Sequence, residues 1–493
     1  MVNLKSRIDS LYYSIISFVE KYYFIFFTLI MLVIGYICFK NLGAFPVQDW
    51  DEARHGVSAY EMFKNNEYIV NTYNYSNDYW NLKPPMSFWA IIMFFKIFGV
   101  SVFSMRLYSA ISMFLTILIV GIFIVKRYGK LEALLALVIF STASPLYLSH
   151  MGRSGDADSI YVLFFTLAML FMIYIGEKSK ALYFSGLFFA LAFLTKSWHA
   201  FSIVSVGGLF LLFTGEIKKM KLKQWILFIA SFIVPILLWI FARIYKDGTH
   251  FLTEMIRYDL LERSKNPLEG HVGPITFYFD YMISNNTELI LLILLVIMLT
   301  IILFYKNSKI KKHDLIAFVL WGVIPFALFT YAKTKIAWYI IPVYVPLFII
   351  ASIAIGKLLK EKKFPLIFKL VIIVLFLGFS ARDTKNNISV VRHPNTDVVQ
   401  NFISNNLVKH KEIYNTKAYI EIEDDKWSQS RLFVGEISAD LKCEQGGIKE
   451  FIKEKDKSIL IISESKYKDN EENLKDLKKL ESDNGLYLLQ KEL

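Results

Sequence analysis

Long apolar runs recur along most of this chain, and they constrain its fold more than any other feature. Between residues 22 and 380, stretches of about 18 or more apolar residues follow one another with short polar breaks, and each is long enough to cross a bilayer as a helix. Charged residues make up only 20% of the 493, fewer than soluble chains carry. The sequence therefore predicts an all-α polytopic membrane protein.

The positions of the lysines and arginines predict how the chain crosses the membrane. They concentrate in five short loops between apolar runs, at 126–130, 178–180, 218–223, 306–312 and 357–363. Basic loops are typical of the cytoplasmic side. The net charge of +12 is thus explained by topology, and we expect no nucleic-acid partner.

Alternation of apolar runs with these loops predicts about eleven membrane-spanning helices, with the N-terminus inside. Residues 22–39 are expected to be an uncleaved signal anchor. Met86–Phe98 is too short to span, and we expect it to lie at the interface or to re-enter. The other predicted spans lie near 104–125, 131–148, 159–175, 181–195, 198–213, 225–243, 287–305, 315–331, 337–355 and 364–380.

This topology places polar segments on the outer side of the cell membrane, which is the inner membrane or the plasma membrane. Two are the loops 43–85 and 244–286, and such long loops are usually functional. The chain therefore divides into a membrane domain, 1–381, and an extracytoplasmic tail, 382–493.

The tail is predicted to form a small soluble α/β domain. It is rich in Lys, Glu, Asp and Asn, unlike the rest of the chain. Strand-like runs occur at Ser458–Ser463 and Leu486–Leu489, and helix-like runs at Gly447–Lys455 and Asn470–Leu480.

Polar and charged residues gather at the outer ends of the predicted helices. The five groups are Gln48–His55, Asn81–Pro85, His150–Asp158, Arg257–Pro274, and the lysines 333 and 335 with Trp338 and Tyr339. Each alone is consistent with a solvated loop or a snorkelling lysine. The lysine pair, however, lies outside against the positive-inside bias, which favours binding of an anion. Five such groups facing one compartment predict an extracytoplasmic catalytic cleft.

The order of these motifs is similar to that in a known family. Its elements are Asp51-Glu52, Lys83-Pro84-Pro85, Phe98–Val100, Arg106–Ala110, Arg153 with Asp158, Leu194–Lys196, and Ala332–Lys335 with Tyr339, Pro342 and Pro346. Together they resemble the GT-C glycosyltransferases, in the subgroup of the protein O-mannosyltransferases and the bacterial aminoarabinose transferase acting on lipid A. The resemblance covers most of residues 45–355.

The resemblance implies transfer of a single sugar from a polyprenyl-phosphate carrier to an acceptor outside the membrane. The acceptor would be lipid A, a cell-envelope glycan or a protein. The family's catalytic carboxylate corresponds to Asp51, its phosphate-contacting residues to Lys83 and Tyr339, and its second acidic motif to Asp158. Its loop histidine matches His271. Aminoarabinose transferases have Glu directly before the Lys-Pro-Pro, where this chain has Leu82.

The chemistry of such a transfer independently needs these residue types. A carboxylate must take the acceptor's proton, and cations must hold the departing phosphate. Direct displacement would invert the anomeric centre. The candidate catalytic residues are Asp51, Glu52 and Asp158, and the candidate phosphate ligands are Lys83, Tyr339, Lys333, Lys335 and Arg54. Arg54 would also keep Asp51 ionised from one helical turn away. Arg153, Asp156 and His271 complete the expected cleft.

We expect transfer that requires no cofactor and no added metal. Leu82 cannot ligate, and Asp78 or Glu52 in its place would leave too few protein ligands for a tight zinc site. His271 is then expected to form hydrogen bonds instead.

Other classes of protein stay open on the sequence alone. A transporter or flippase for a lipid-linked sugar would also have many helices and outer charges, but should show polar residues at mid-membrane depth and a pair of broken helices. A ligase or polymerase would move a whole glycan from a polyprenyl-pyrophosphate donor. A structural scaffold would leave the ordered motifs unexplained.

Overall fold

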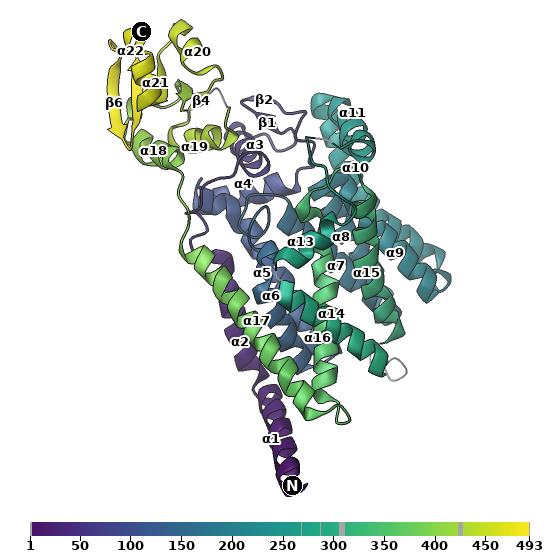
Figure 1. Cartoon of the computed structure of the whole chain (residues 1–493). Coiled ribbons are helices and arrows are strands. Elements are labelled where there is room, and N and C mark those ends of the chain that lie inside the picture. The colour runs from purple at the N-terminus through teal and green to yellow at the C-terminus, as the bar shows by residue number, and fades with distance from the viewer. Residues whose placement is uncertain (1, 268, 286, 305–310, 423–426, 493) are drawn as a thin grey trace.

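The structure, a computed structural model, describes residues 2–267, 269–285, 287–304, 311–422 and 427–492. A bundle of long helices forms most of it, and a smaller domain with a β-sheet packs at one end of the bundle (Figure 1). Part of one predicted basic loop, with Lys306 and Lys309, lies outside the described residues.

Each predicted span contains a helix of the bundle, although α1 was not predicted and α6 ends before residue 148. The helices of the bundle are α1 (Val2–Lys21), α2 (Tyr23–Phe39), α5 (Val102–Arg127), α6 (Lys130–Thr142), α7 (Asp158–Ile173), α8 (Ala181–Lys196), α9 (Phe201–Thr214), α10 (Leu222–Asp247), α14 (Thr287–Phe304), α15 (Lys312–Tyr331), α16 (Ile341–Lys360) and α17 (Leu366–Arg392). Among the described residues, six helical segments are long and apolar enough to cross a membrane, or up to eight if each of two bent helix pairs counts as one span. A multi-pass membrane fold is confirmed, whereas the count of eleven stays a prediction.

Several of the basic loops meet at the end of the bundle that lies away from the small domain. Arg127 there pairs with Glu177 and Asp314, and Lys360 bridges Glu20 and Glu132. Figure 1 shows α1 and the lower ends of α16 and α17 at this end. The side of the membrane on which this end lies stays a prediction.

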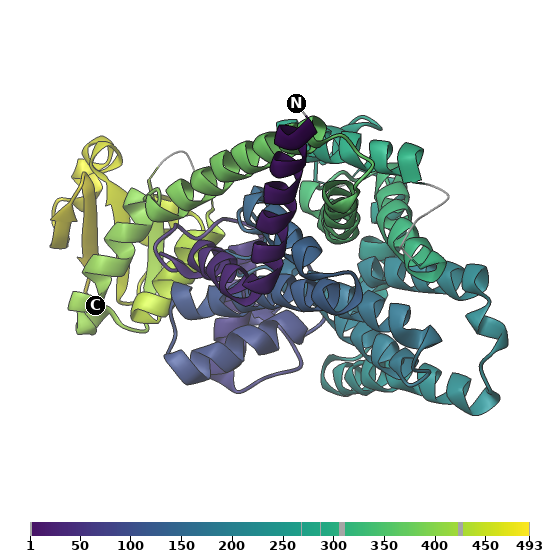
Figure 2. The same ribbon diagram turned by 90° about the horizontal axis from the view of Figure 1, so that it is seen from below.

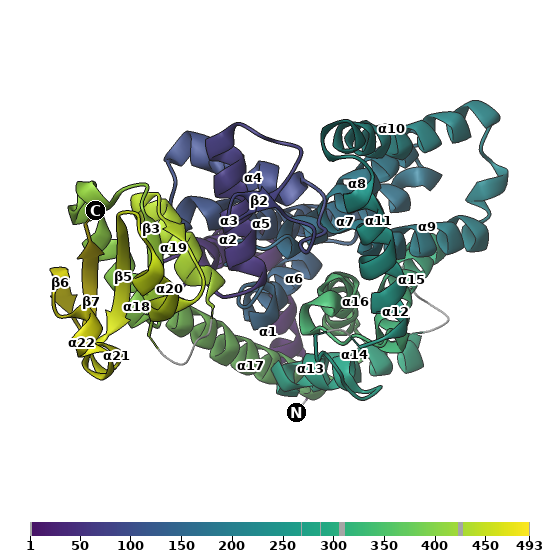
Figure 3. The same cartoon turned by 90° about the horizontal axis from the view of Figure 1, so that it is seen from above.

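The two outer loops fold into short elements at the opposite end of the bundle, where those of the first loop lie beside the small domain and those of the second lie farther from it (Figure 3). The first loop forms α3 (Asp51–Asn65) and a hairpin of β1 (Thr72–Tyr73) and β2 (Ser76–Asn77), and α4 (Met86–Phe98) follows. As expected, α4 is apolar but shorter than a membrane span. The second loop forms α11 (His250–Glu254), a π-helical turn over Met255–Glu262, α12 (Arg263–Lys265) and α13 (Phe277–Asn285).

The small domain is an α/β domain, as predicted. Its strands are β3 (Lys417–Glu421), β4 (Lys442–Cys443), β5 (Ser458–Ser463), β6 (Lys478–Asp483) and β7 (Leu486–Lys491), in the order β4-β3-β5-β7-β6. The first three strands are parallel, and β7 runs antiparallel to both β5 and β6. Its helices are α18 (Val398–Asn406), α19 (Gln429–Ala439), α20 (Gly447–Lys453), α21 (Glu464–Asp469) and α22 (Glu471–Leu474).

One helix prediction in this domain is wrong. The run Asn470–Leu480 is helical only over α22, and residues from Lys478 onward form strand β6. Pairing with β7, whose Leu488 and Leu489 are buried in the domain core, fixes the extended conformation here. Tertiary packing thus overrides the local helical pattern.

Helix α17 links the two parts without a linker at the predicted boundary of residues 381 and 382. It continues to Arg392, and Figure 2 shows it running along the outside of the bundle toward the small domain. Its polar second half is held because Asn387 donates hydrogen bonds to the carbonyls of Ser141 and Thr142, which end α6. Carbonyls at a helix end need such partners.

Of the three apolar cores among the described residues, two involve the helix bundle, and the third lies within the small domain. The larger one fills the bundle. The other is shared between the outer helices and the small domain, and it contains Val57 and Met62 of α3, Ile91 of α4, Phe433 of α19 and Ile459 of β5. The small domain therefore packs directly on α3, whose first residue is Asp51.

Candidate active site

A cavity of about 520 Å³ lies where the two outer loops meet the ends of the bundle helices. Its walls come from widely separated segments of the chain: the start of α3, the segments before α4, α7 and α16, the end of α8, and the second outer loop. Of the residues expected in a cleft, it brings together Asp51, Lys83, His271 and Tyr339. These four are between 32 and 288 positions apart in the sequence, so only the fold unites them.

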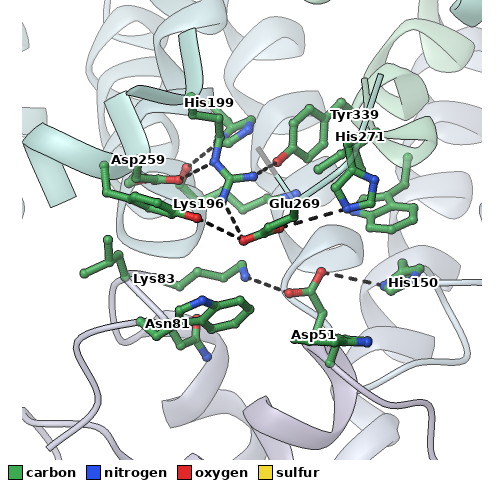
Figure 4. Close-up of a pocket in the computed structure, with 18 of the residues that line it drawn as sticks. Asp51, Asn81, Lys83, His150, Lys196, His199, Asp259, Glu269, His271 and Tyr339 are labelled. Carbon is green, nitrogen blue, oxygen red and sulfur yellow. Dashed lines mark hydrogen bonds and ion pairs between the residues drawn. The ribbon is translucent and has the colours of Figure 1, made fainter. Parts of the chain in front are cut away.

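Asp51 and Lys83 form one wall of the cavity, as Figure 4 shows. Asp51 is the first residue of α3, and the Nζ of Lys83 donates to its Oδ1 at 3.3 Å. Burial alone would raise the pKa of Asp51, but the charges of Lys83 and His150 outweigh it and hold that pKa below its ordinary value. The carboxylate is therefore ionised, and its side chain is 30% exposed and open to the cavity.

The opposite wall carries a group of polar side chains around Tyr339 (Figure 4). The guanidinium of Arg263 donates to the hydroxyl of Tyr339 at 3.4 Å and pairs with Asp259 at 3.2 Å. Lys196 lies 4.8 Å from the centre of the Tyr339 ring and pairs with Asp158 at 2.7 Å. Two further cations thus face Lys83 across the cavity.

His150 approaches Asp51 from the side away from Lys83. Its Nδ1 lies 2.7 Å from Asp156 Oδ2 and 4.0 Å from Asp51 Oδ2, and its ring stacks on Trp338 at 3.6 Å. The backbone of His150 is left-handed, with φ of 58°, a conformation that is uncommon for non-glycine residues. Burial lowers its pKa, but the neighbouring Asp156 carboxylate more than reverses this and raises the pKa to about 9.

A pH dependence follows from this raised pKa. The imidazolium is present below pH 9 and is lost as the pH rises through about 9, which removes one of the two cations beside Asp51. His150 also lines the cavity, so its positive charge is no longer available there to stabilise negative charge that develops during the reaction. We therefore expect kcat to fall over that range in a pH–rate profile. In Asp156→Asn the imidazole loses its partner, so this limb should move toward the ordinary value of 6.5. His150→Gln should lack the limb and be slower by roughly 10-fold. Identical basic limbs in all three proteins would contradict this role.

Glu52 does not line the cavity, although it follows Asp51 directly. Its carboxylate is fully buried and accepts two hydrogen bonds from Arg106 of α5, at 2.6 and 2.9 Å, and one from the Gly155 amide. A pair of this kind is costly to break, because the remaining charge would be buried alone. Glu52 therefore has a structural environment rather than a catalytic one.

Two arginines expected at the cleft also have other partners. Arg54 forms a bidentate pair with Asp78 and lies over the rings of Tyr73 and Trp80, so it does not orient Asp51 as expected. Arg153 donates four hydrogen bonds to the carbonyls of residues 37, 38, 40 and 41 at the end of α2. These carbonyls end a helix and need donors, so the role of Arg153 is to cap α2.

The remaining predicted residues lie behind the cavity or away from it. Asp156 and Asp158 are buried and reach the cavity only through His150 and Lys196. The Nζ of Lys335 donates to the carbonyls of Phe329 and Thr330, and Lys333 is exposed. Neither lysine lines the cavity, so neither is placed to hold a phosphate there.

Three cationic residues of the cavity, His150, Lys196 and Arg263, were assigned no role from the sequence, although each lies in one of the polar groups or ordered motifs noted there. Lys196 lies at the outer end of a predicted span, which is the same departure from the positive-inside bias that singled out the 333–335 pair. No comparable signal marks Arg263, because charged residues surround it in the second outer loop.

Groups that could hold a metal ion are small among the described residues. His271 and Glu269 line the cavity 4.0 Å apart, and Leu82 beside Lys83 offers no ligand atom. Asp51, His150 and Asp156 have ligand atoms within 4.8 Å of one another, but His150 Nδ1 already bonds to Asp156. A tight zinc site needs three or four protein ligands, so the pair of His271 and Glu269 is by itself too small for one, whereas the group at Asp51 offers three. Transfer without added metal therefore stays a prediction.

Known proteins match this chain in sequence. Residues 82–239 match the family model of the dolichyl-phosphate-mannose-protein mannosyltransferases. An uncharacterized protein of Aquifex aeolicus (strain VF5) is 27% identical over 308 residues, which are 62% of this chain and 68% of that protein.

Solved structures resemble this chain over most of its length. ArnT from Cupriavidus metallidurans, bound to undecaprenyl phosphate, has a TM-score of 0.68 at 13% identity, and the match covers 94% of this chain and 97% of ArnT. The Archaeoglobus fulgidus oligosaccharyltransferase has a TM-score of 0.53 at 11% identity, over 91% of this chain and 70% of that enzyme. The chain therefore has the GT-C fold of these membrane glycosyltransferases and carries, in residues 82–239, a segment that matches the mannosyltransferase family.

Proposed function

We propose that this chain is an integral-membrane glycosyltransferase that moves one sugar from a polyprenyl-phosphate carrier to an acceptor outside the membrane. One observation carries the proposal: an ionised, accessible carboxylate, Asp51, faces a cavity whose walls hold several cations. The match to the mannosyltransferase family and the likeness to ArnT, which was solved with undecaprenyl phosphate, support it.

The donor phosphate would lie between Lys83 and the opposite wall. Arg263 and the hydroxyl of Tyr339 present donors from that wall, and Lys196 adds positive charge behind the Tyr339 ring. Arginine can hold a phosphate through two parallel hydrogen bonds, and lysine acts as a point charge. The phosphate would thus replace Asp51 as the group that accepts a hydrogen bond from the Lys83 ammonium.

Transfer would then proceed by a single displacement. The acceptor hydroxyl loses its proton to an oxygen of Asp51, and its oxygen attacks the anomeric carbon of the sugar. The bond from that carbon to the phosphate oxygen breaks, and its electron pair stays on the released polyprenyl phosphate, whose charge the cations stabilise. Attack from the side opposite to the phosphate inverts the anomeric centre.

Loss of the Lys83 contact on donor binding has a chemical consequence. In the structure, Lys83 and His150 together hold the pKa of Asp51 below its ordinary value and so make it a weak base. When the phosphate attracts Lys83, only His150 remains beside the carboxylate, and its basicity increases. The donor would thereby prepare the base for the acceptor. No added metal is needed in this scheme.

The function can be tested in cells by mass spectrometry of envelope lipids, glycans and glycoproteins. We compare cells that have the wild-type protein, lack it, or have Asp51→Asn. We expect one class of molecule to lose the mass of a single sugar in the latter two. Loss of a whole oligosaccharide would instead indicate a ligase or polymerase. A modification that Asp51→Asn restores fully would contradict this function.

A further inference from the structure

The C-terminal domain contacts the segment that leads into Asp51, and we propose that it is a working part of the active site because it positions the Asp51 carboxylate. This proposal rests on the proposed function, since it gives the domain a role in the same reaction. Figures 1 and 3 both show α19 of this domain beside α3. The contacts come from two of its helices.

The first turn of α19 holds the two residues that precede the catalytic aspartate. The Oε1 of Gln429 accepts a hydrogen bond from the backbone amide of Trp50 at 2.7 Å. The carboxylate of Asp49 accepts bonds from the amide of Ser430 at 2.7 Å and from the hydroxyl of Ser428 at 3.0 Å. An acidic side chain at a helix N-terminus is also favoured by the helix dipole.

Helix α18 contacts the same segment at a position slightly earlier in the chain. The buried side-chain amide of Gln400 bonds to Val47 in both directions, accepting from its amide at 2.8 Å and donating to its carbonyl at 2.9 Å. The backbone from Val47 to Trp50 is therefore fixed by side chains that lie about 350 to 380 positions later in the chain.

The backbone at Trp50 shows why such support matters. Its φ is 67° and its ψ is −114°, a strained conformation for a residue with a side chain, and strain of this kind persists only where the surroundings impose it. No side chain caps α3 at this residue. The bond from Gln429 acts on the amide of Trp50 itself, one peptide before the residue whose carboxylate does the chemistry.

The body of α3 is held by the same domain. A Cβ at Gly56 would stand 2.8 Å from the ring of Phe433, so α3 and α19 approach each other very closely there. The C-terminal domain thus fixes both the helix that carries Asp51 and the strained turn before it. A displacement of about 1 Å in a reacting group can cost a hundredfold in rate, so loosening this support should slow the reaction.

The test uses the full-length protein in lipid nanodiscs and a series of Gln→Met replacements, which keep the side-chain length but remove the amide. Gln429→Met and Gln400→Met each release the Val47–Trp50 segment. We expect kcat to fall roughly 10- to 100-fold in each, with the KM for the donor changed less than about threefold. Hydrogen exchange of the amides between residues 47 and 51 should rise. The matched control is Gln490→Met, a buried glutamine of β7 in the same domain.

The outcomes separate this proposal from others. Normal kcat in Gln429→Met and Gln400→Met, with faster exchange of the loop amides, would overturn it. An equal loss in Gln490→Met would mean that the domain only needs to be folded, and would overturn it too. If wild-type protein transfers no sugar, the proposed function fails. Faster exchange in the two variants would then show only that the contacts hold the loop.

Discussion

Replacing Asp51 by Asn is expected to lower turnover by roughly 10²–10⁴-fold, the range that general base catalysis contributes. Asparagine keeps the shape of the side chain but cannot accept the proton of the acceptor hydroxyl. Donor binding should change much less, because Lys83 loses only a partner that the phosphate would replace. The measurement is kcat for transfer by protein in membranes, with the KM for the donor from the same experiment.

The control for this variant is Asp280→Asn, an exposed aspartate of α13 in the second outer loop. It should keep wild-type turnover. If Asp51→Asn also kept near-normal turnover, Asp51 would not be the base. The role would then have to pass to Asp259, which lines the same cavity, because Glu52 is buried against Arg106.

Replacing Lys83 by Ala is expected to weaken inhibition by undecorated polyprenyl phosphate by roughly 10- to 100-fold, the value of one hydrogen bond to a charged group. Transfer should slow as well, because the phosphate gains charge as it leaves. The assay is competition by the undecorated lipid against the donor. Arg263→Ala should have an effect of similar size, since its guanidinium lies on the opposite wall.

The chain offers a matched control for this prediction in Lys333→Ala. Lys333 is an exposed lysine near the site but does not line the cavity. Inhibition of this variant should equal that of wild type. Equal inhibition of Lys83→Ala and wild type would place the phosphate elsewhere, and a strong effect of Lys333→Ala would point to the rim of the cavity.

The sequence is sufficient to predict much of this arrangement. Apolar runs and basic loops predict a multi-pass bundle, because a bilayer imposes helix length and charge placement directly. Asp51, Lys83 and Tyr339 could be grouped because each stands at the outer end of a helix or loop. Their meeting in one cavity agrees with that grouping, while their catalytic roles stay predictions.

The sequence pattern does not reveal which distant residue a charged side chain contacts in the fold. Glu52 and Asp51 are alike in sequence, yet Glu52 faces Arg106, 54 positions later, whereas Asp51 faces the cavity. Arg153 and Lys335 carry a positive charge, as a phosphate ligand would. The side chain of each, however, donates its hydrogen bonds to backbone carbonyls at a helix end. The roles of such residues depend on which unsatisfied backbone groups the fold brings near them.

The C-terminal domain is the clearest case of this kind. Its polar composition predicts a separate soluble domain, and nothing in its sequence points to the active site. The contacts of Gln400 and Gln429 become visible only when the domain is packed on α3. A polar tail therefore turned out to share an apolar core with the helix that carries Asp51.

The most direct test of the central claim is to follow the donor lipid itself by mass spectrometry. Purified protein in nanodiscs would receive a polyprenyl-phosphate-linked sugar together with an envelope extract as acceptor. We expect undecorated polyprenyl monophosphate to appear in equal amount to an acceptor that gains one sugar, and neither product to form with Asp51→Asn. A carrier that crosses the bilayer with its sugar still attached, or a product released as pyrophosphate, would contradict the claim.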